Sequence, residues 1–152
     1  MATRGLPAWP YTDAAPEDLP AAERLLIDAA RCWAAACQHG EAPLPVMTRL
    51  LATERAEQAG PAIDALLRAL AETAPLTLGC PLSPRLVGEE PPLLLAAALV
   101  QRGARREALG CMLKHLPARH AYAAVAAMIG IGCAFRRNGL CFTDPWNRPE
   151  TG

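Results

Sequence analysis

The segment Ala121–Phe135, AYAAVAAMIGIGCAF, runs for fifteen residues without a charged side chain, and arginines lie close to both of its ends. A helix needs about 20 predominantly apolar residues to cross a bilayer, so the uncharged segment is too short for that role. An uncharged helix of this length is typical of a protein core or of an interface between subunits. We therefore predict a central helix over residues 118–137 and no contact with a membrane.

The composition of the whole chain also favours helices. Hydrophobic residues make up 52% of the 152 residues but aromatic residues only 5%, so alanine and leucine must fill most of the core. Alanine is the strongest helix former, and the β-branched residues are too thinly scattered to build strands. We predict a single all-α domain over residues 1–152, built as a compact bundle or orthogonal array of about six helices.

Apolar spacing, prolines and glycines divide the chain into helices and connections. The predicted helices cover about residues 20–38, 46–51, 53–74, 92–102, 104–115 and 118–137. Gly60-Pro61 should kink or split the third helix, and Thr53 is a candidate cap at its start. The other predicted parts are an extended N-terminal arm (1–18), a long Pro/Gly-rich connection (75–92) and a C-terminal tail (140–152).

The net charge of zero hides an asymmetry along the chain. Residues 1–90 carry seven Lys or Arg against twelve Asp or Glu, whereas residues 91–152 carry eight against three. This pattern favours docking of the two halves onto each other; the alternative is a basic half that faces an acidic partner. The sequence pI of 6.8 gives no general attraction to phosphate and argues against nucleic acid as a partner.

No catalytic or cofactor motif is present in the sequence. No Gly-rich nucleotide loop follows a strand, and Ser83, the only serine, does not lie in a nucleophile elbow. Most carboxylates are expected on solvent faces. Glu89 and Glu90, at the start of the helix over 92–102, could bind a ligand, but their simpler role is to complement the helix N-terminus. We therefore predict a non-catalytic protein without a cofactor. The proline-rich N-terminus lacks the apolar segment of a secretory signal, which favours a cytoplasmic location.

The six cysteines are expected to be reduced in the cytoplasm and mostly buried as small hydrophobic residues. Cys111 and His115 are four residues apart and share a helix face, so they could form half of a metal site or a His-activated thiol. Cys133 and Cys141 are the candidate further ligands. The simpler interpretation is a buried cysteine and a helix-end histidine, and we predict no metal.

The remaining cysteines offer one candidate metal-binding cluster and one candidate reactive thiol. Cys32, Cys37 and His39 form a cluster, but helix positions five apart point about 140° away from each other, which disfavours chelation by the two thiols. Cys80 lies in the long connection and is expected to be the most exposed thiol, although no neighbouring base marks it as a nucleophile.

The candidate partner-binding residues lie in the two tails and around one turn. They are Trp9, Trp146, Arg102, Arg105 and Arg106. Tryptophan and arginine are frequent anchors of protein interfaces. Arginines beside a turn also occur in helix-turn-helix proteins, but the helix over 104–115 lacks the polar side chains that read base edges.

Small residues recur at intervals of four in the central helix, at Ala126, Gly130 and Ala134. This spacing allows another helix to approach closely, which favours a core helix and leaves a homodimer seam as the alternative. We predict an accessory, adaptor or regulatory protein that binds another protein. The alternatives are a cysteine-dependent module that binds a metal or cofactor or senses redox state and, less favoured, a nucleic-acid-binding regulator.

Overall fold

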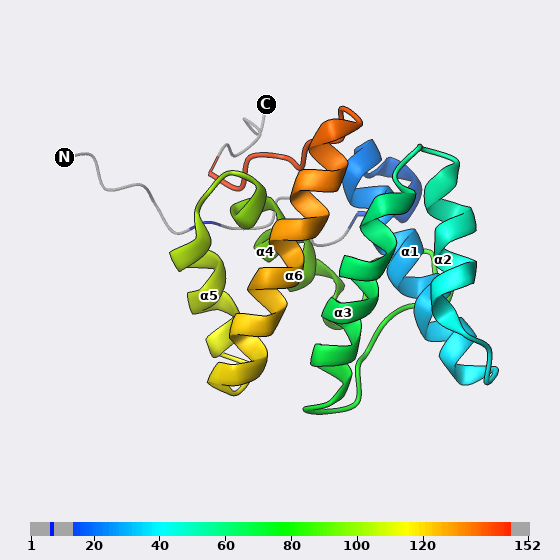
Figure 1. Cartoon of the computed structure of the whole chain (residues 1–152), viewed down its shortest axis with the longest axis horizontal. Helices are drawn as coiled ribbons and strands as arrows, with labels where there is room; N and C mark the ends of the chain where they lie inside the picture. Colours follow the sequence, from blue (N-terminus) through cyan, green and yellow to red (C-terminus); the bar gives the residue numbers. More distant parts are fainter. Residues whose placement is uncertain (1–6, 8–13, 147–152) are drawn as a thin grey trace.

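The protein is an all-α bundle, as predicted. The computed structural model describes residue 7 and residues 14–146. This part contains no strand, and its helices are α1 (Ala21–Gln38), α2 (Pro43–Ala52), α3 (Gly60–Ala71), α4 (Glu90–Gln101), α5 (Arg105–Leu113) and α6 (Ala118–Arg137), with the 3₁₀ helices η1 (Pro16–Asp18) and η2 (Glu57–Ala59) (Figure 1).

The helix ends follow the signals that were read from the sequence. Prolines lie in the first turns of α2, α3 and α4, where a missing backbone N–H leaves no hydrogen bond unmade. The predicted break at Gly60-Pro61 is confirmed, since α3 begins at Gly60. The part of that predicted helix before the break is not α-helical, because residues 53–59 form a turn and η2. Glycines follow the ends of α1, α4 and α6, as predicted: Gly40, Gly103 and Gly139.

Two local predictions were wrong. Thr53 does not cap the following helix; it lies at the C-terminal end of α2, where its hydroxyl donates to the Leu50 carbonyl oxygen at 2.7 Å. The N-terminal arm is not extended throughout residues 1–18, because Pro16–Asp18 forms η1. A proline at the first helical position fixes φ in the helical range, and the acidic residues after it suit the positive end of a helix.

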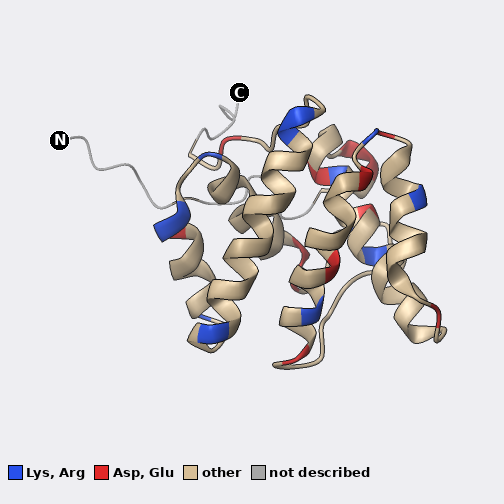
Figure 2. Cartoon of the chain, in the orientation of Figure 1, with Lys and Arg blue, Asp and Glu red and all other residues tan. Residues whose placement is uncertain are grey.

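Helix α6 lies at the centre of the bundle. It packs against α3, α4 and α5, and in Figure 1 it runs between α5 and α3 with α4 behind it. Met128, Ile131 and Phe135 on its inner face are fully buried, whereas Tyr122 on the outer face is 63% exposed. In Figure 2 the ribbon of α6 carries charge only near its two ends.

The uncharged segment 121–135 is too short to cross a bilayer, but helix α6 as a whole is longer than that segment. Its 20 residues, with a mean hydropathy of 1.3 in the most apolar window, are long and apolar enough to cross a membrane. The core helix of a soluble protein can have the same length and composition. In this bundle 44% of that window is buried against other helices.

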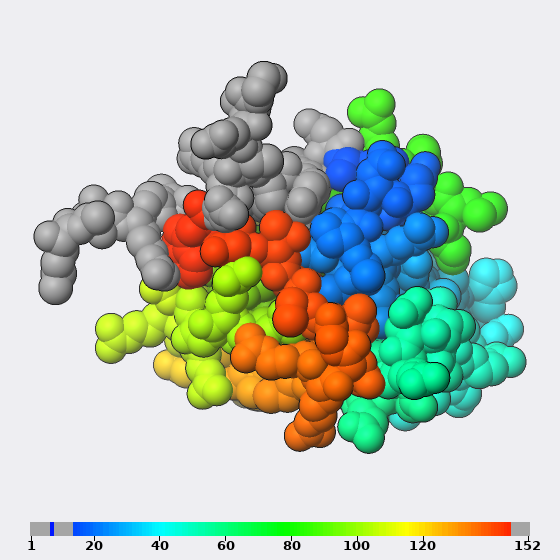
Figure 3. Space-filling model, turned by 90° about the horizontal axis from the view of Figure 1, so that it is seen from above, coloured from blue at the N-terminus to red at the C-terminus, as the bar shows by residue number. Residues whose placement is uncertain are grey.

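The segment 140–146 of the C-terminal tail packs across the helices. Phe142 is buried and stacks on Phe135 with the ring centroids 5.6 Å apart. The backbone N–H of Phe142 donates to the Gln101 side chain at 2.7 Å, and that of Thr143 donates to Glu23 at 2.6 Å. Glu23 is fully buried, so it departs from the expectation that carboxylates lie on solvent faces. In Figure 3 this segment (red) lies against α1 (blue).

Candidate functional site

The long connection between α3 and α4 is closed by hydrogen bonds between its two ends. The backbone N–H of Glu89 donates to the Thr77 carbonyl at 3.2 Å, and the backbone N–H of Thr77 donates to Glu89 Oε2 at 2.7 Å. A compact surface segment with adjacent ends is an Ω-loop, a type of loop that is often functional. We refer to residues 77–89 as the Ω-loop.

The Ω-loop encloses a buried ion pair formed by two residues outside the loop. Arg31 of α1 and Glu90, the first residue of α4, have side chains that are 1% and 0% exposed. They form two parallel hydrogen bonds, from Arg31 Nε to Glu90 Oε2 at 2.7 Å and from Nη2 to Oε1 at 2.9 Å. The hydrogen bond to the Glu90 carboxylate raises the pKa of Arg31. This bidentate geometry is the strong form of such a pair and offsets the removal of both charges from water.

Both members of the ion pair also bind the backbone of the Ω-loop. Arg31 donates to the carbonyl oxygens of Ser83 and Arg85, at 3.0 and 2.9 Å. Glu90 accepts from the backbone N–H groups of Gly79 and Val87, at 3.3 and 2.8 Å. The ion pair therefore fixes the loop backbone at four points.

This ion pair was not predicted from the sequence, and Glu90 was expected to complement a helix N-terminus. Glu90 is in the first turn of α4, but its carboxylate bonds the Arg31 side chain and amides of the Ω-loop. One signal was present: Arg31 follows the apolar Ile27 by four residues, so the two side chains share a face of α1. A charged residue on such a face indicates a buried partner, although it does not identify that partner.

Leu82 lies in the exposed part of the Ω-loop. Its side chain is 91% exposed, the largest value among the exposed large hydrophobic residues that the structure describes. Pro81 precedes it and Pro84 follows Ser83, and both have a restricted φ angle. In Figure 3 the bright green part of the connection projects from the surface beyond α1.

The same loop carries the exposed thiol of Cys80. Its Sγ lies 3.2 Å from the Ser83 hydroxyl, and this hydrogen bond lowers the pKa of the Cys80 thiol. Burial has the opposite effect on Cys32 of α1, whose pKa is raised. Since the thiolate is the nucleophile, Cys80 has the more reactive environment of the two.

We expect iodoacetamide to modify Cys80 well before Cys32 at pH 7. The alkylation rate of Cys80 should rise with pH around a lower midpoint than that of Cys32, because a lowered pKa increases the thiolate fraction at neutral pH. Peptide mapping by mass spectrometry over a series of pH values measures both rates. Ser83→Ala should move the Cys80 midpoint upward and leave that of Cys32 in place; an unchanged Cys80 midpoint would show that the hydroxyl has no such effect.

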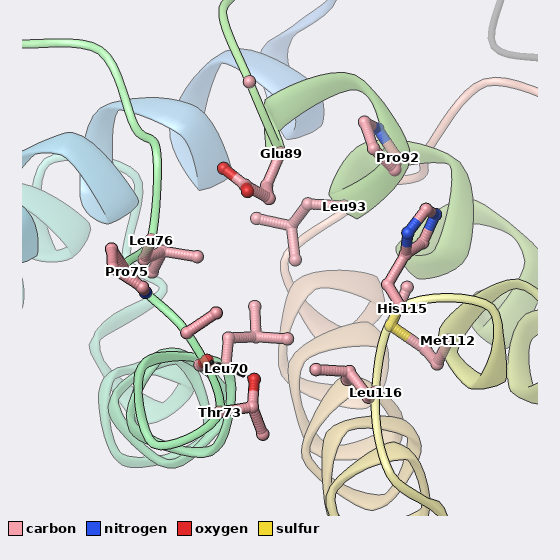
Figure 4. Close-up of a pocket in the computed structure, with 12 residues that line it drawn as sticks. Leu70, Thr73, Pro75, Leu76, Glu89, Pro92, Leu93, Met112, His115 and Leu116 are labelled. Atoms are coloured by element: carbon pink, nitrogen blue, oxygen red, sulfur yellow. Dashed lines mark hydrogen bonds between the residues drawn. The ribbon is translucent and has the colours of Figure 1, made fainter.

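An apolar pocket of about 360 Å³ lies at the base of the Ω-loop, among the ends of α3, α4 and α5 (Figure 4). Its apolar walls include Leu70, Pro75, Leu76, Pro92, Leu93, Met112 and Leu116. Three polar side chains also line it: Thr73, Glu89 and His115. The Thr73 hydroxyl already donates to the Leu70 carbonyl oxygen at 3.0 Å, so Glu89 and His115 remain as polar groups for a ligand.

The candidate metal ligands are not gathered into one site. His115 is exposed and lines the pocket, Cys111 is half-buried against the core, and Cys133 and Cys141 are exposed. In the part of the chain that the structure describes, no three His, Cys, Asp or Glu side chains lie close enough to hold a metal ion.

The expectation that most cysteines are buried was wrong. All six thiols are free; Cys32 and Cys111 are half-buried, and the other four are exposed. Cys37 lies in the last turn of α1, where the side chain reaches solvent. Alanine and leucine fill the core positions instead.

The predicted partner-binding residues have different surroundings. Arg102 lies 3.5 Å from Asp144 and thus links the end of α4 to the tail, whereas Arg105 and Arg106 are exposed at the start of α5. Trp146 is half-buried and packs against the core. Trp9 lies outside the described residues.

Comparison of the chain with protein-family models, with curated proteins and with solved structures gives no significant match. The Ω-loop and the pocket at its base are therefore the two features of the structure that bear on function.

Proposed function

We propose that this protein is a non-catalytic helical interaction protein, an accessory, adaptor or regulatory subunit that binds a partner protein through the Ω-loop. The observation that supports this most directly is Leu82, 91% exposed on a loop whose backbone is held by a buried ion pair. Single exposed leucines are common on protein surfaces. Leu82 differs because the backbone on its C-terminal side is held by hydrogen bonds from the buried Arg31 to the carbonyl oxygens of Ser83 and Arg85.

A fixed loop is favourable for binding because it loses little conformational entropy when the complex forms. A connection that only joined α3 to α4 could be flexible, and it would not require two charges to be buried. We expect a partner with an apolar pocket that takes the Leu82 side chain. Full burial of a leucine side chain contributes about 1.5–3 kcal/mol, which is the size of an interface hot spot.

Leu82→Ser should weaken the complex with the partner at least about tenfold while the stability of the isolated protein changes by less than about 0.5 kcal/mol. To find the partner, the photoreactive residue p-benzoylphenylalanine is placed at exposed position 85, and the protein is irradiated in an extract of its native cells. We expect one main adduct, which mass spectrometry identifies. Calorimetry then measures the affinity of that partner for the unaltered protein and for Leu82→Ser.

The matched control is Leu113→Ser, which changes a leucine that is 45% exposed on α5. The yield of the crosslinked partner and the affinity for the partner should equal those of the protein with Leu113. Equal weakening by both substitutions, or an adduct that Leu82→Ser does not reduce, would contradict the assignment of the contact to the Ω-loop. An adduct between two copies of this chain would contradict a separate partner and favour the homodimer.

The other two functional classes stay predictions. The cysteine-dependent module was based on Cys111 and His115, which were expected to share a helix face. Helix α5 ends at Leu113, so His115 lies in the turn beyond it, and the described residues hold no group of three possible metal ligands. The nucleic-acid-binding regulator was based on the arginines near the start of α5, of which Arg105 and Arg106 are exposed. Neither arrangement adds support beyond that given by the sequence.

A further inference from the structure

We infer that the pocket at the base of the Ω-loop binds amphiphilic organic cations, molecules that join an apolar body to an ammonium or guanidinium group. This site differs from the Leu82 contact, so the inference does not depend on the proposed partner protein. It rests on the apolar walls of the pocket and on the only formal charge among its lining residues, that of Glu89.

The apolar walls suit the body of such a ligand. The volume of about 360 Å³ falls within the range of about 300–1,000 Å³ that is usual for small-molecule pockets. Leu93 and Met112 are 2% and 5% exposed, so the packing of the bundle holds them in place. In Figure 4 the side chains of Leu70, Leu93 and Leu116 point toward the open space from three sides.

The carboxylate of Glu89 suits the charged group of the ligand. Glu89 is half-buried, and the hydrogen bond from Thr77 holds its Oε2. Among residues 14–146, its Oε1 accepts no hydrogen bond and no lysine or arginine forms an ion pair with the carboxylate. A partly desolvated carboxylate beside an apolar wall attracts a cation more strongly than a carboxylate in open water does.

Glu89 is the N-cap residue of α4, and the positive end of that helix offsets only part of the carboxylate charge. Glu72, next to Thr73, lies 3.1 Å from His120 of α6 and is itself negative. His115 lies on the α5 side of the pocket and is exposed. Charge complementarity therefore favours a cation over an anion or an uncharged molecule of the same shape.

Three probes with the same hydrocarbon chain separate the apolar contribution from the charge: hexylammonium, hexanol and hexanoate. Each is titrated into the full chain at pH 7.5, and the shifts of backbone amide signals are followed by NMR. We expect hexylammonium to bind most tightly and to shift the amides of Thr77, Glu89 and Leu93. Glu89→Gln should weaken hexylammonium binding by about tenfold and leave hexanol binding unchanged.

Glu89→Gln keeps an oxygen that can accept the hydrogen bond from Thr77, so the Ω-loop should remain closed. The matched control is Glu41→Gln, an exposed carboxylate that does not line the pocket, and it should leave all three probes unaffected. A salt titration of the unaltered protein gives a second test, because added salt should weaken hexylammonium binding but not hexanol binding. Hexanoate binding as tight as that of hexylammonium, or no shift at the pocket with any probe, would overturn the inference.

Discussion

Replacing Arg31 with methionine is expected to destabilise the folded protein by about 3–5 kcal/mol, as removal of one partner of a buried ion pair usually does. Methionine replaces much of the arginine stem but donates no hydrogen bond. Glu90 would then keep only its two backbone donors, and the carbonyl groups of Ser83 and Arg85 would lose theirs. Urea unfolding followed by circular dichroism measures the change in the free energy of unfolding.

The control for this prediction is Arg24→Met on the same helix. Arg24 is 53% exposed and lies 3.7 Å from Asp28, so its loss should change the stability by less than about 1 kcal/mol. The double variant Arg31→Met/Glu90→Leu removes both buried charges and should lose less stability than the two single changes combined. Similar small losses for Arg31→Met and Arg24→Met would contradict the role given to the buried pair.

Gly88→Ala should destabilise the protein by about 2–5 kcal/mol, the second-largest expected effect. Gly88 has φ of +52°, and an added Cβ would lie 2.4 Å from the carbonyl oxygen of Thr77. A left-handed conformation costs an alanine about 1–2 kcal/mol. The clash adds to this, because Thr77 cannot move away without breaking the hydrogen bonds that close the Ω-loop.

Gly40→Ala separates the two contributions. Gly40 follows α1 with φ of +69°, and an added Cβ there would meet nothing within 4 Å. We expect this variant to lose about 1 kcal/mol, the conformational contribution alone. Urea midpoints of the two variants give the comparison. Equal losses would mean that the close approach of Thr77 is not what requires a glycine at position 88.

The helices could be predicted from the sequence because their signals are local. The bounds predicted for α6 match those in the structure, and α1 begins one residue later than predicted. Helix α4 shows where such signals are weaker. It begins at Glu90 instead of Pro92, because Pro91 and Pro92 fit the first turn of a helix as well as they fit the loop before it.

The candidate site could be predicted only in part. The proline-rich connection was predicted, but the ion pair that orders it joins residues 59 positions apart. The local spacing of apolar residues does not show which distant side chain will pair with a buried charged residue. The pocket has the same origin, since Leu70, Glu89 and Met112 come from separate elements that meet only after folding.

The bond between Thr143 and Glu23 also has a consequence for the order in which the protein folds during synthesis. The two residues are 120 positions apart, so the ribosome makes α1 long before it makes the partner of its buried carboxylate. Until then Glu23 must remain hydrated or bind something else. Burial of Glu23 beneath residues 140–146 therefore can be completed only after these residues have left the ribosome, and a chain that stops before Phe142 should leave this side of α1 uncovered.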